Sequence, residues 1–217
     1  MRSALVVAGI VAAASALARA APLSSDEITR LCMEAEGPAH CARKIEAEQM
    51  KRLPGVASRE GDVLKVALYP NGTATFADVD TISGGTAFAL WDYVSEINAT
   101  VLWVMRDDDA GFLIVQRATN RQTPLPSEPV VSPDRKRIVT ADFCTTRCEN
   151  LLTVWTVARD GIARELQWAP KERWSDAGVR WRGPDALVVE YTPDGAEAPK
   201  TLERKLADPG WTRIGGK

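Results

Sequence analysis

The sequence predicts a mainly β protein, built from antiparallel sheets and preceded by a short αα-hairpin. From Asp62 onward apolar and polar residues alternate with a period of two, and turn residues recur at short intervals. A helical period is confined to residues 23–53. Strands separated by short turns, with no long helical pattern between them, are typical of antiparallel all-β folds.

The first twenty residues have the build of a secretory signal. Basic Arg2 precedes an uncharged apolar run from Ala4 to Leu17, and Ala18-Arg19-Ala20 supplies small residues for cleavage. A membrane anchor is the alternative, but the run is shorter than the roughly 20 residues that span a bilayer. We therefore expect residues 1–20 to be removed after Ala20, a periplasmic or secreted location, and no transmembrane segment in the mature chain.

The charge balance argues against nucleic acid as a partner. Without Arg2 and Arg19 the chain carries 25 basic and 29 acidic residues, a formal net charge of −4. Proteins that bind nucleic acid usually carry a basic patch or stripe.

All four cysteines lie in the exported part of the chain. An even number of cysteines in an oxidising compartment indicates disulfides. Three pairings are possible, and the simplest joins Cys32 to Cys41 and Cys144 to Cys148. A zinc site that uses His40 is disfavoured, because these spacings lack the usual CxxC pairs. We expect no metal and no cofactor.

Residues 21–55 are predicted to form a disulfide-stapled αα-hairpin. Ser24 and Glu27 have the spacing of a capping box, and Gly37-Pro38 breaks the helical pattern before a second helix from Ala39 to about Leu53. Residues 56–61 are interpreted as a linker to the β domain, residues 62–217.

The β domain begins with a hairpin signal at Asn71-Gly72, with strand patterns on both sides. Later segments of alternating or β-branched character are the remaining strand candidates. They are residues 87–93, 99–105, 112–118, 121–125, 130–131, 137–143, 151–158, 164–168, 178–181, 187–191 and 201–205.

The turn Ser132-Pro133-Asp134 resembles the S-P-D-G-K turn of WD40-like and TolB-type β-propeller repeats, with Arg135 in the place of the usual glycine. The resemblance implies that residues 130–168 form a four-stranded blade, with partial units before and after it. About three units fit the chain, whereas closed propellers use four to eight blades. We therefore expect blade-like sheets in a partial or small propeller-like array, or alternatively a β-sandwich of two sheets.

Residues suited to catalysis are sparse. The single histidine, His40, is adjacent to Cys41, which argues against a Ser-His-Asp or Cys-His site. Paired carboxylates would support a hydrolase, and a glycosidase needs two across its substrate. The candidates are Asp78, Asp80, Asp92, Asp107, Asp108, Asp109, Asp142, Asp176 and Glu190. Nothing in the sequence brings two of them together, so a non-enzymatic protein is expected and a carboxylate-dependent hydrolase is the weakest alternative.

Seven tryptophans indicate either dense packing or a binding surface. Trp103 and Trp155 lie in apolar runs and are assigned to the core. Trp168, Trp174 and Trp181 lie near polar turns, with Arg173 and Arg180 close by. Packing is the plain reading of these three indoles, and an exposed aromatic and basic surface is the functional one.

We interpret the chain as a binding module that recognises a protein partner or an envelope glycan through the residues just named. The alternative is an enzyme inhibitor that uses the constrained loop from Cys144 to Cys148, in which Thr146 and Arg147 would contact the target. A short disulfide-closed loop is preorganised, which lowers the entropic cost of binding.

Overall fold

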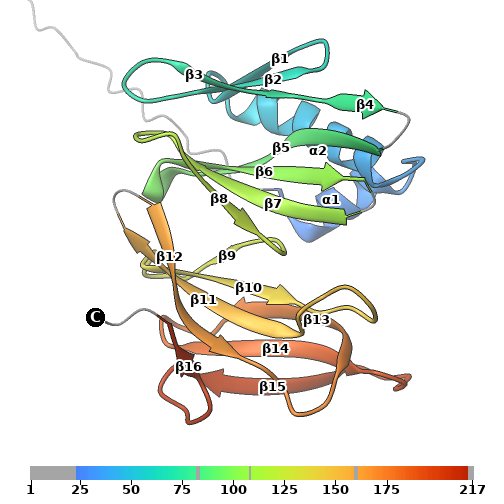
Figure 1. Ribbon diagram of the computed structural model, residues 1–217, viewed down its shortest axis with the longest axis vertical. Helices are drawn as coiled ribbons and strands as arrows, with labels where there is room; N and C mark the ends of the chain where they lie inside the picture. Colours follow the sequence, from blue (N-terminus) through green and yellow to red (C-terminus); the bar gives the residue numbers. More distant parts are fainter. Residues whose placement is uncertain (1–22, 82–83, 108, 159–160, 215–217) are drawn as a thin grey trace, which may run out of the picture.

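The computed structural model describes residues 23–81, 84–107, 109–158 and 161–214, and the predicted signal sequence lies outside these ranges. In them the chain forms two α-helices followed by four antiparallel β-sheets (Figure 1). Neither helix in this part of the chain has the length and apolar character needed to cross a bilayer.

The helices confirm the capping and disulfide predictions at the N-terminus. Helix α1 (Ser25–Cys32) begins with a capping box, in which Ser24 accepts from the Glu27 amide and Glu27 accepts from the Ser24 amide. Helix α2 (Pro38–Arg52) follows after a short turn, and a Cys32–Cys41 disulfide joins the two. A second disulfide joins Cys144 to Cys148, so both local pairings are confirmed.

The strands are distributed over the four sheets largely in chain order. The first sheet contains β1 (Ala57–Glu60), β2 (Val63–Ala67) and β3 (Thr73–Ala77). The second contains β4 (Val79–Thr81), β5 (Gly84–Val94), β6 (Ala99–Arg106), β7 (Asp109–Gln116) and β8 (Arg121–Leu125), with the 3₁₀ turn η1 (Ser95–Ile97) between β5 and β6. The third contains β9 (Val130–Val131), β10 (Arg137–Asp142), β11 (Leu151–Ala158), β12 (Gly161–Trp168) and the C-terminal β16 (Thr212–Arg213). The fourth contains β13 (Trp174–Trp181), β14 (Ala186–Pro193) and β15 (Lys200–Lys205).

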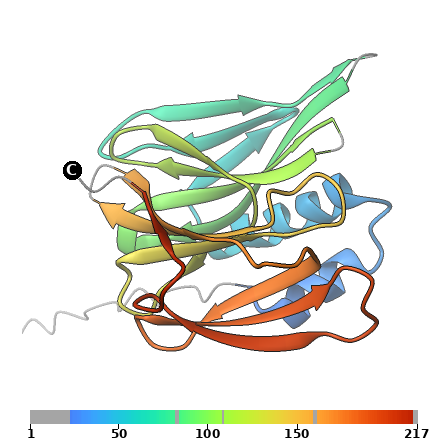
Figure 2. The ribbon, with the colours of Figure 1, turned by 60° about the horizontal axis from the view of Figure 1, so that its bottom comes forward.

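The sheets lie one upon another in a stack, with the first and fourth at opposite ends (Figures 1 and 2). Each interface between neighbouring sheets has its own apolar core. Strands of the two inner sheets supply both cores beside them, because successive side chains point to opposite faces. On β10, for example, Ile138 packs toward the second sheet and Val139 toward the fourth. This explains why the inner strands are apolar on both faces.

Two expectations from the sequence are wrong. The β region forms four sheets, so a sandwich of two sheets is excluded for the described residues. Residues 57–60, interpreted as linker, form strand β1, which pairs with β2 through a tight turn at Gly61. Gly61 has a φ of +56°, a conformation that glycine adopts without steric cost, and this turn lets so short and polar a segment pair with its neighbour.

Helix α2 covers part of one edge of the second sheet. Strand β4 pairs only with the first residues of β5, which leaves later edge groups of β5 without a strand partner. Side-chain carboxylates accept hydrogen bonds from these backbone groups instead. The amide of Phe88 donates to Asp78 Oδ1 at 2.9 Å, and the amide of Leu90 donates to Glu46 Oε2 at 2.9 Å. Buried backbone groups need such partners, because leaving one unpaired is costly.

The carboxylate at this edge belongs to a buried ionic cluster. Glu46 is only 5 % exposed and forms ion pairs with Arg59 and with Arg43, the latter at 3.0 Å. Both arginines also pair with Asp78, and Arg59 Nη2 donates to the Phe88 carbonyl at 2.6 Å. Burial raises the pKa of Glu46, against the opposing effects of the Leu90 amide and Arg43. The cluster joins the helical hairpin to the β region, and Ala42 of α2 also packs with Ala89 and Trp103 of the second sheet in a small apolar core.

We expect Glu46→Ala to lower the free energy of unfolding by about 3–5 kcal/mol, because the half-buried Arg43 and Arg59 would lose a counter-charge and the buried Leu90 amide would lose its acceptor. Glu46→Gln keeps an oxygen for that amide and should cost less. Lys51→Ala on the same helix is the control, since its side chain is 74 % exposed, and should change stability by less than about 0.5 kcal/mol. Urea unfolding measures all three, and equal losses at positions 46 and 51 would contradict the assignment.

Candidate functional site

The tryptophans expected on an exposed surface pack instead between the third and fourth sheets. Trp174 is 2 % exposed and stacks on Tyr191, with the ring centroids 3.9 Å apart. Trp181 is half-buried and donates its indole N–H to the Val130 carbonyl at 2.8 Å. The guanidinium of Arg204 lies over the Trp168 ring, 4.5 Å from its centroid.

The expectation of an exposed aromatic surface is therefore corrected for Trp174. A β-bulge at Ser175 shifts the alternation of β13, so Trp174 points inward with Ala177 and Val179 even though polar residues flank it in the sequence. Arg173 and Arg180 are exposed, as expected, but the buried Trp174 does not join them in a surface patch.

The disulfide loop places Thr146 and Arg147 in exposed positions. The Arg147 side chain forms an ion pair with Asp109 of β7, with Nη1 and Oδ1 2.7 Å apart. This contact ties the loop to the second sheet.

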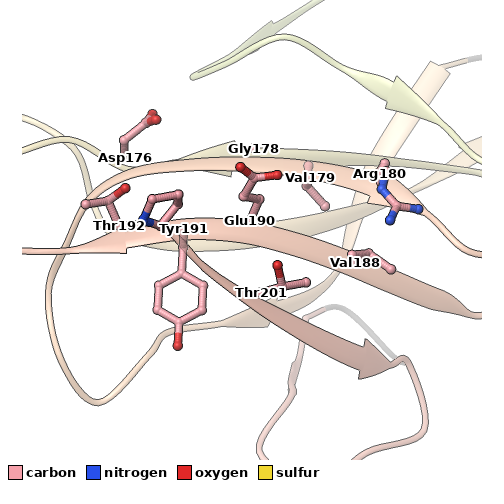
Figure 3. A pocket seen from close by; sticks show the side chains of 10 residues that line it. Asp176, Gly178, Val179, Arg180, Val188, Glu190, Tyr191, Thr192 and Thr201 are labelled. Atoms are coloured by element: carbon pink, nitrogen blue, oxygen red, sulfur yellow. The ribbon is translucent and has the colours of Figure 1, made fainter. Parts of the chain in front are cut away.

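A shallow depression of about 400 Å³ lies over the fourth sheet. Figure 3 shows Asp176 and Arg180 of β13 and Glu190 of β14 among its lining residues. All three are exposed, so the candidate carboxylates Asp176 and Glu190 lie at the surface. They occupy alternate positions on strands at one end of the stack, where the outer face meets solvent and polar side chains are expected.

A larger cleft, of about 740 Å³, lies where the second and third sheets meet. Its walls come from separate parts of the chain: the end of α2, the last residues of β5 with η1, and the segment around β9. The lining residues are Leu53, Trp91, Asp92, Tyr93, Val94, Ser95, Glu96, Val101, Glu128, Pro129, Val130, Val131 and Arg135. Aromatic, apolar and charged groups thus converge here, as they do in many ligand sites.

A β-bulge positions Trp91 and Asp92. Leu90 is opposite Leu102 and Asp92 is opposite Val101, so Trp91 is an extra residue without a register partner in β6. The Trp91 carbonyl instead accepts from Gln49 Nε2 of helix α2 at 2.6 Å. Bulges bend a strand and redirect its side chains, often beside functional sites.

Two carboxylates, those of Asp92 and Glu128, line the cleft. Glu128 accepts from the Trp91 indole N–H at 2.8 Å, and Asp92 accepts from the Tyr93 amide at 2.7 Å. Burial raises the pKa of both groups, and the charge of Asp92 raises that of Glu128 further. Glu128 is an exposed residue, and its carboxylate accepts from the Trp91 indole at the cleft. In the described residues neither carboxylate forms an ion pair.

Arg135 enters the cleft from the Ser-Pro-Asp turn. Ser132 Oγ donates to Asp134 Oδ1 at 2.7 Å and accepts from the Arg137 amide at 3.0 Å, which closes the turn. Arg135 has a φ of +62° and is the only described residue with positive φ that is neither Gly, Asn nor Asp. Its guanidinium pairs with Glu96 at 3.3 Å. Strained residues of this kind cluster at functional sites.

The lining of the cleft carries more negative than positive charge. It combines three carboxylates and one guanidinium with the aromatic Trp91 and Tyr93. In the part of the chain described by the structure, no group of three His, Cys, Asp or Glu side chains is arranged to hold a metal ion.

Sequence reasoning identified Asp92 as a candidate carboxylate but missed Trp91, Glu96, Glu128 and Arg135 as its neighbours. Their convergence depends on the bulge and on the packing of two sheets. The one local signal was Arg135 in a turn position that usually carries glycine.

Comparisons of the chain with protein-family models, with curated proteins and with solved structures found no match.

We expect Arg135→Gly to be more stable than Arg135→Ala by about 1 kcal/mol. Both variants lose the ion pair to Glu96, and only glycine adopts positive φ without steric cost. Elsewhere alanine is usually the more stable of the two, so the reversed order is diagnostic. Equilibrium unfolding of both variants measures the difference, and a more stable alanine variant would show that the turn is unstrained.

The two cleft carboxylates should make stability depend on pH. Because their pKa values are raised on folding, their favourable contribution is complete below the ordinary carboxyl pKa and is lost as pH rises through the raised values. The other charged groups lining the cleft are Glu96 and Arg135, which pair with each other. The double variant Asp92→Asn, Glu128→Gln should therefore melt at a higher temperature than wild type at pH 7.

This advantage should shrink below about pH 4, where the wild-type carboxyls are protonated. Asp176→Asn, outside the cleft and exposed, is the control and should match wild type at each pH. Thermal melts across the range provide the measurement. A double variant that is less stable than wild type at pH 7 would contradict the assigned direction.

Proposed function

We propose that this protein is an exported, non-enzymatic binding module, a partial propeller-like array of four sheets whose ligand site is the cleft between the second and third sheets. The observation that carries the proposal is the convergence of Trp91, Asp92, Glu128 and Arg135 in one cleft of about 740 Å³. Two disulfides are consistent with an oxidising compartment, which supports export.

The shape and lining of the cleft favour a protein partner. The apolar Val94, Val130 and Val131 lie beside charged and aromatic groups, so the cleft suits a segment that carries both apolar and polar side chains. Interfaces between proteins concentrate their binding energy in a few aromatic and arginine residues within such pockets. An envelope glycan is the competing ligand class.

Charge reversal in the cleft should abolish partner capture. We expect Glu128→Arg to retain less than about a tenth of the partner that wild type retains from a periplasmic extract, because it introduces a cation beside the Trp91 indole. Glu190→Arg is the matched control, since it makes the same change in the outer depression of the fourth sheet, and should capture as wild type does.

Protease treatment of the extract separates the ligand classes: a protein partner disappears and a glycan persists. Capture that survives Glu128→Arg but is lost in Glu190→Arg would move the site to the fourth sheet and overturn the proposal. Circular dichroism checks that both variants are folded.

A carboxylate-dependent hydrolase is a second candidate, favoured by one observation: Asp92 and Glu128 share the cleft and both have raised pKa values. Turnover on a glycan or ester panel that disappears in Asp92→Asn and in Glu128→Gln would establish it. The inhibitor alternative uses Thr146 and Arg147, and it fails if alanine at both positions leaves partner binding unchanged.

A further inference from the structure

The cleft carries more carboxylates than cationic groups. Asp92, Glu96 and Glu128 line the cleft together with one guanidinium, that of Arg135, which is paired with Glu96. Asp92 and Glu128 have no ion pair in the described part of the chain, although each accepts one hydrogen bond from an uncharged donor. A carboxylate has several acceptor sites, so both retain capacity for a further donor.

The surroundings of these carboxylates favour a positively charged donor over water. Burial destabilises the ionised forms of both carboxylates, and repulsion from Asp92 at Glu128 and from Glu96 at Asp92 adds to it, as the raised pKa values show. A cation placed between the two carboxylates would relieve that repulsion, and charge-assisted hydrogen bonds are stronger than neutral ones. The cleft already holds one guanidinium of its own at Glu96, which shows that it accommodates this group.

The aromatic lining adds a second preference. Trp91 and Tyr93 line the same cleft, and cations are attracted to aromatic faces, most strongly to tryptophan. The rings of Trp91 and Phe112 pack edge to face, with an interplanar angle of 81° and the centroids 5.3 Å apart, so the indole is held in place by packing. A rigid indole contacts a ligand at small entropic cost.

We propose that the cleft binds an arginine or lysine side chain of the partner, with its cationic group between Asp92 and Glu128 and its aliphatic stem along Trp91. This inference rests on the proposed function, because it names the group that enters the same cleft.

The probe that tests it is N-acetyl-arginine amide, compared with N-acetyl-citrulline amide, which has nearly the same shape without the charge. The readout is the indole N–H resonance of Trp91 in ¹⁵N-labelled protein, identified by its absence in Trp91→Phe. The hydrogen bond to Glu128 makes this resonance sensitive to a cation at the carboxylate.

We expect the arginine derivative to shift the Trp91 resonance saturably and the citrulline derivative to leave it unchanged. Asp92→Asn and Glu128→Gln should each weaken the arginine titration by about tenfold, whereas Glu190→Gln on the fourth sheet should not. Raising the salt concentration from about 0.05 M to 0.5 M should also weaken it. The outer-sheet variant, together with melting temperatures of the carboxamide variants no lower than that of wild type, separates loss of binding from loss of fold.

Equal shifts with both derivatives, no shift with either, or an undiminished titration in both carboxamide variants would overturn the inference. Partner capture that depends on Glu128, without any arginine-induced shift, would leave the cleft as the binding site and reject only the cationic ligand. If substitutions in the cleft changed neither partner capture nor the resonance shift, the site itself would be rejected.

Discussion

A buried carboxylate at the edge of a strand joins the helical hairpin to the sheets. Glu46, on helix α2, accepts from the backbone of β5 and is neutralised by two arginines that also reach Asp78. A sheet edge left open is prone to pair with other chains, and natural proteins cover such edges. Here the cover is a helix held by charges, and the Cys32–Cys41 disulfide anchors that helix to its neighbour. The small helical hairpin is therefore part of the β structure and has little prospect of stability apart from it.

The cleft follows from where this cover ends. Gln49 of α2 binds the Trp91 carbonyl, and the last residues of β5 then pass beyond the helix toward the third sheet. The bulge at Trp91 and the strained turn at Arg135 both lie at this junction. Each lowers the stability of the folded state, relative to a regular strand at Trp91 or a glycine at position 135. The bulge also serves the apolar cores, because it changes the face of β5 and directs Leu90 to the core beside the first sheet and Val94 to the core beside the third. The positive φ of Arg135 serves no such packing, since Arg135 is exposed, and its location at the cleft supports a role in binding.

The local features of the fold could be predicted from the sequence, whereas the site could not. The capping box at Ser24, both disulfides and the strands around the Ser-Pro-Asp turn depend on neighbouring residues, and all are present in the structure. Trp174 was misplaced because its polar neighbours suggested exposure, whereas a β-bulge at Ser175 turns it inward. Glu128 lies 36 positions after Asp92 in a loop without a motif, and only packing between sheets brings the two together. Such pairs leave no periodic signal in one sequence.

The doubly apolar strands of the inner sheets also pose a problem of register. On β6, Val101 and Leu102 point to different cores, and a slip of one residue would merely exchange one apolar side chain for another. Burial therefore distinguishes poorly between the correct and the slipped pairing. Asp92 does distinguish them, because it is opposite Val101 in the native register and a slip of β5 would turn its carboxylate toward the core between the first and second sheets. The charge of Asp92, placed in the cleft by the native register, thus also penalises misaligned strands during folding.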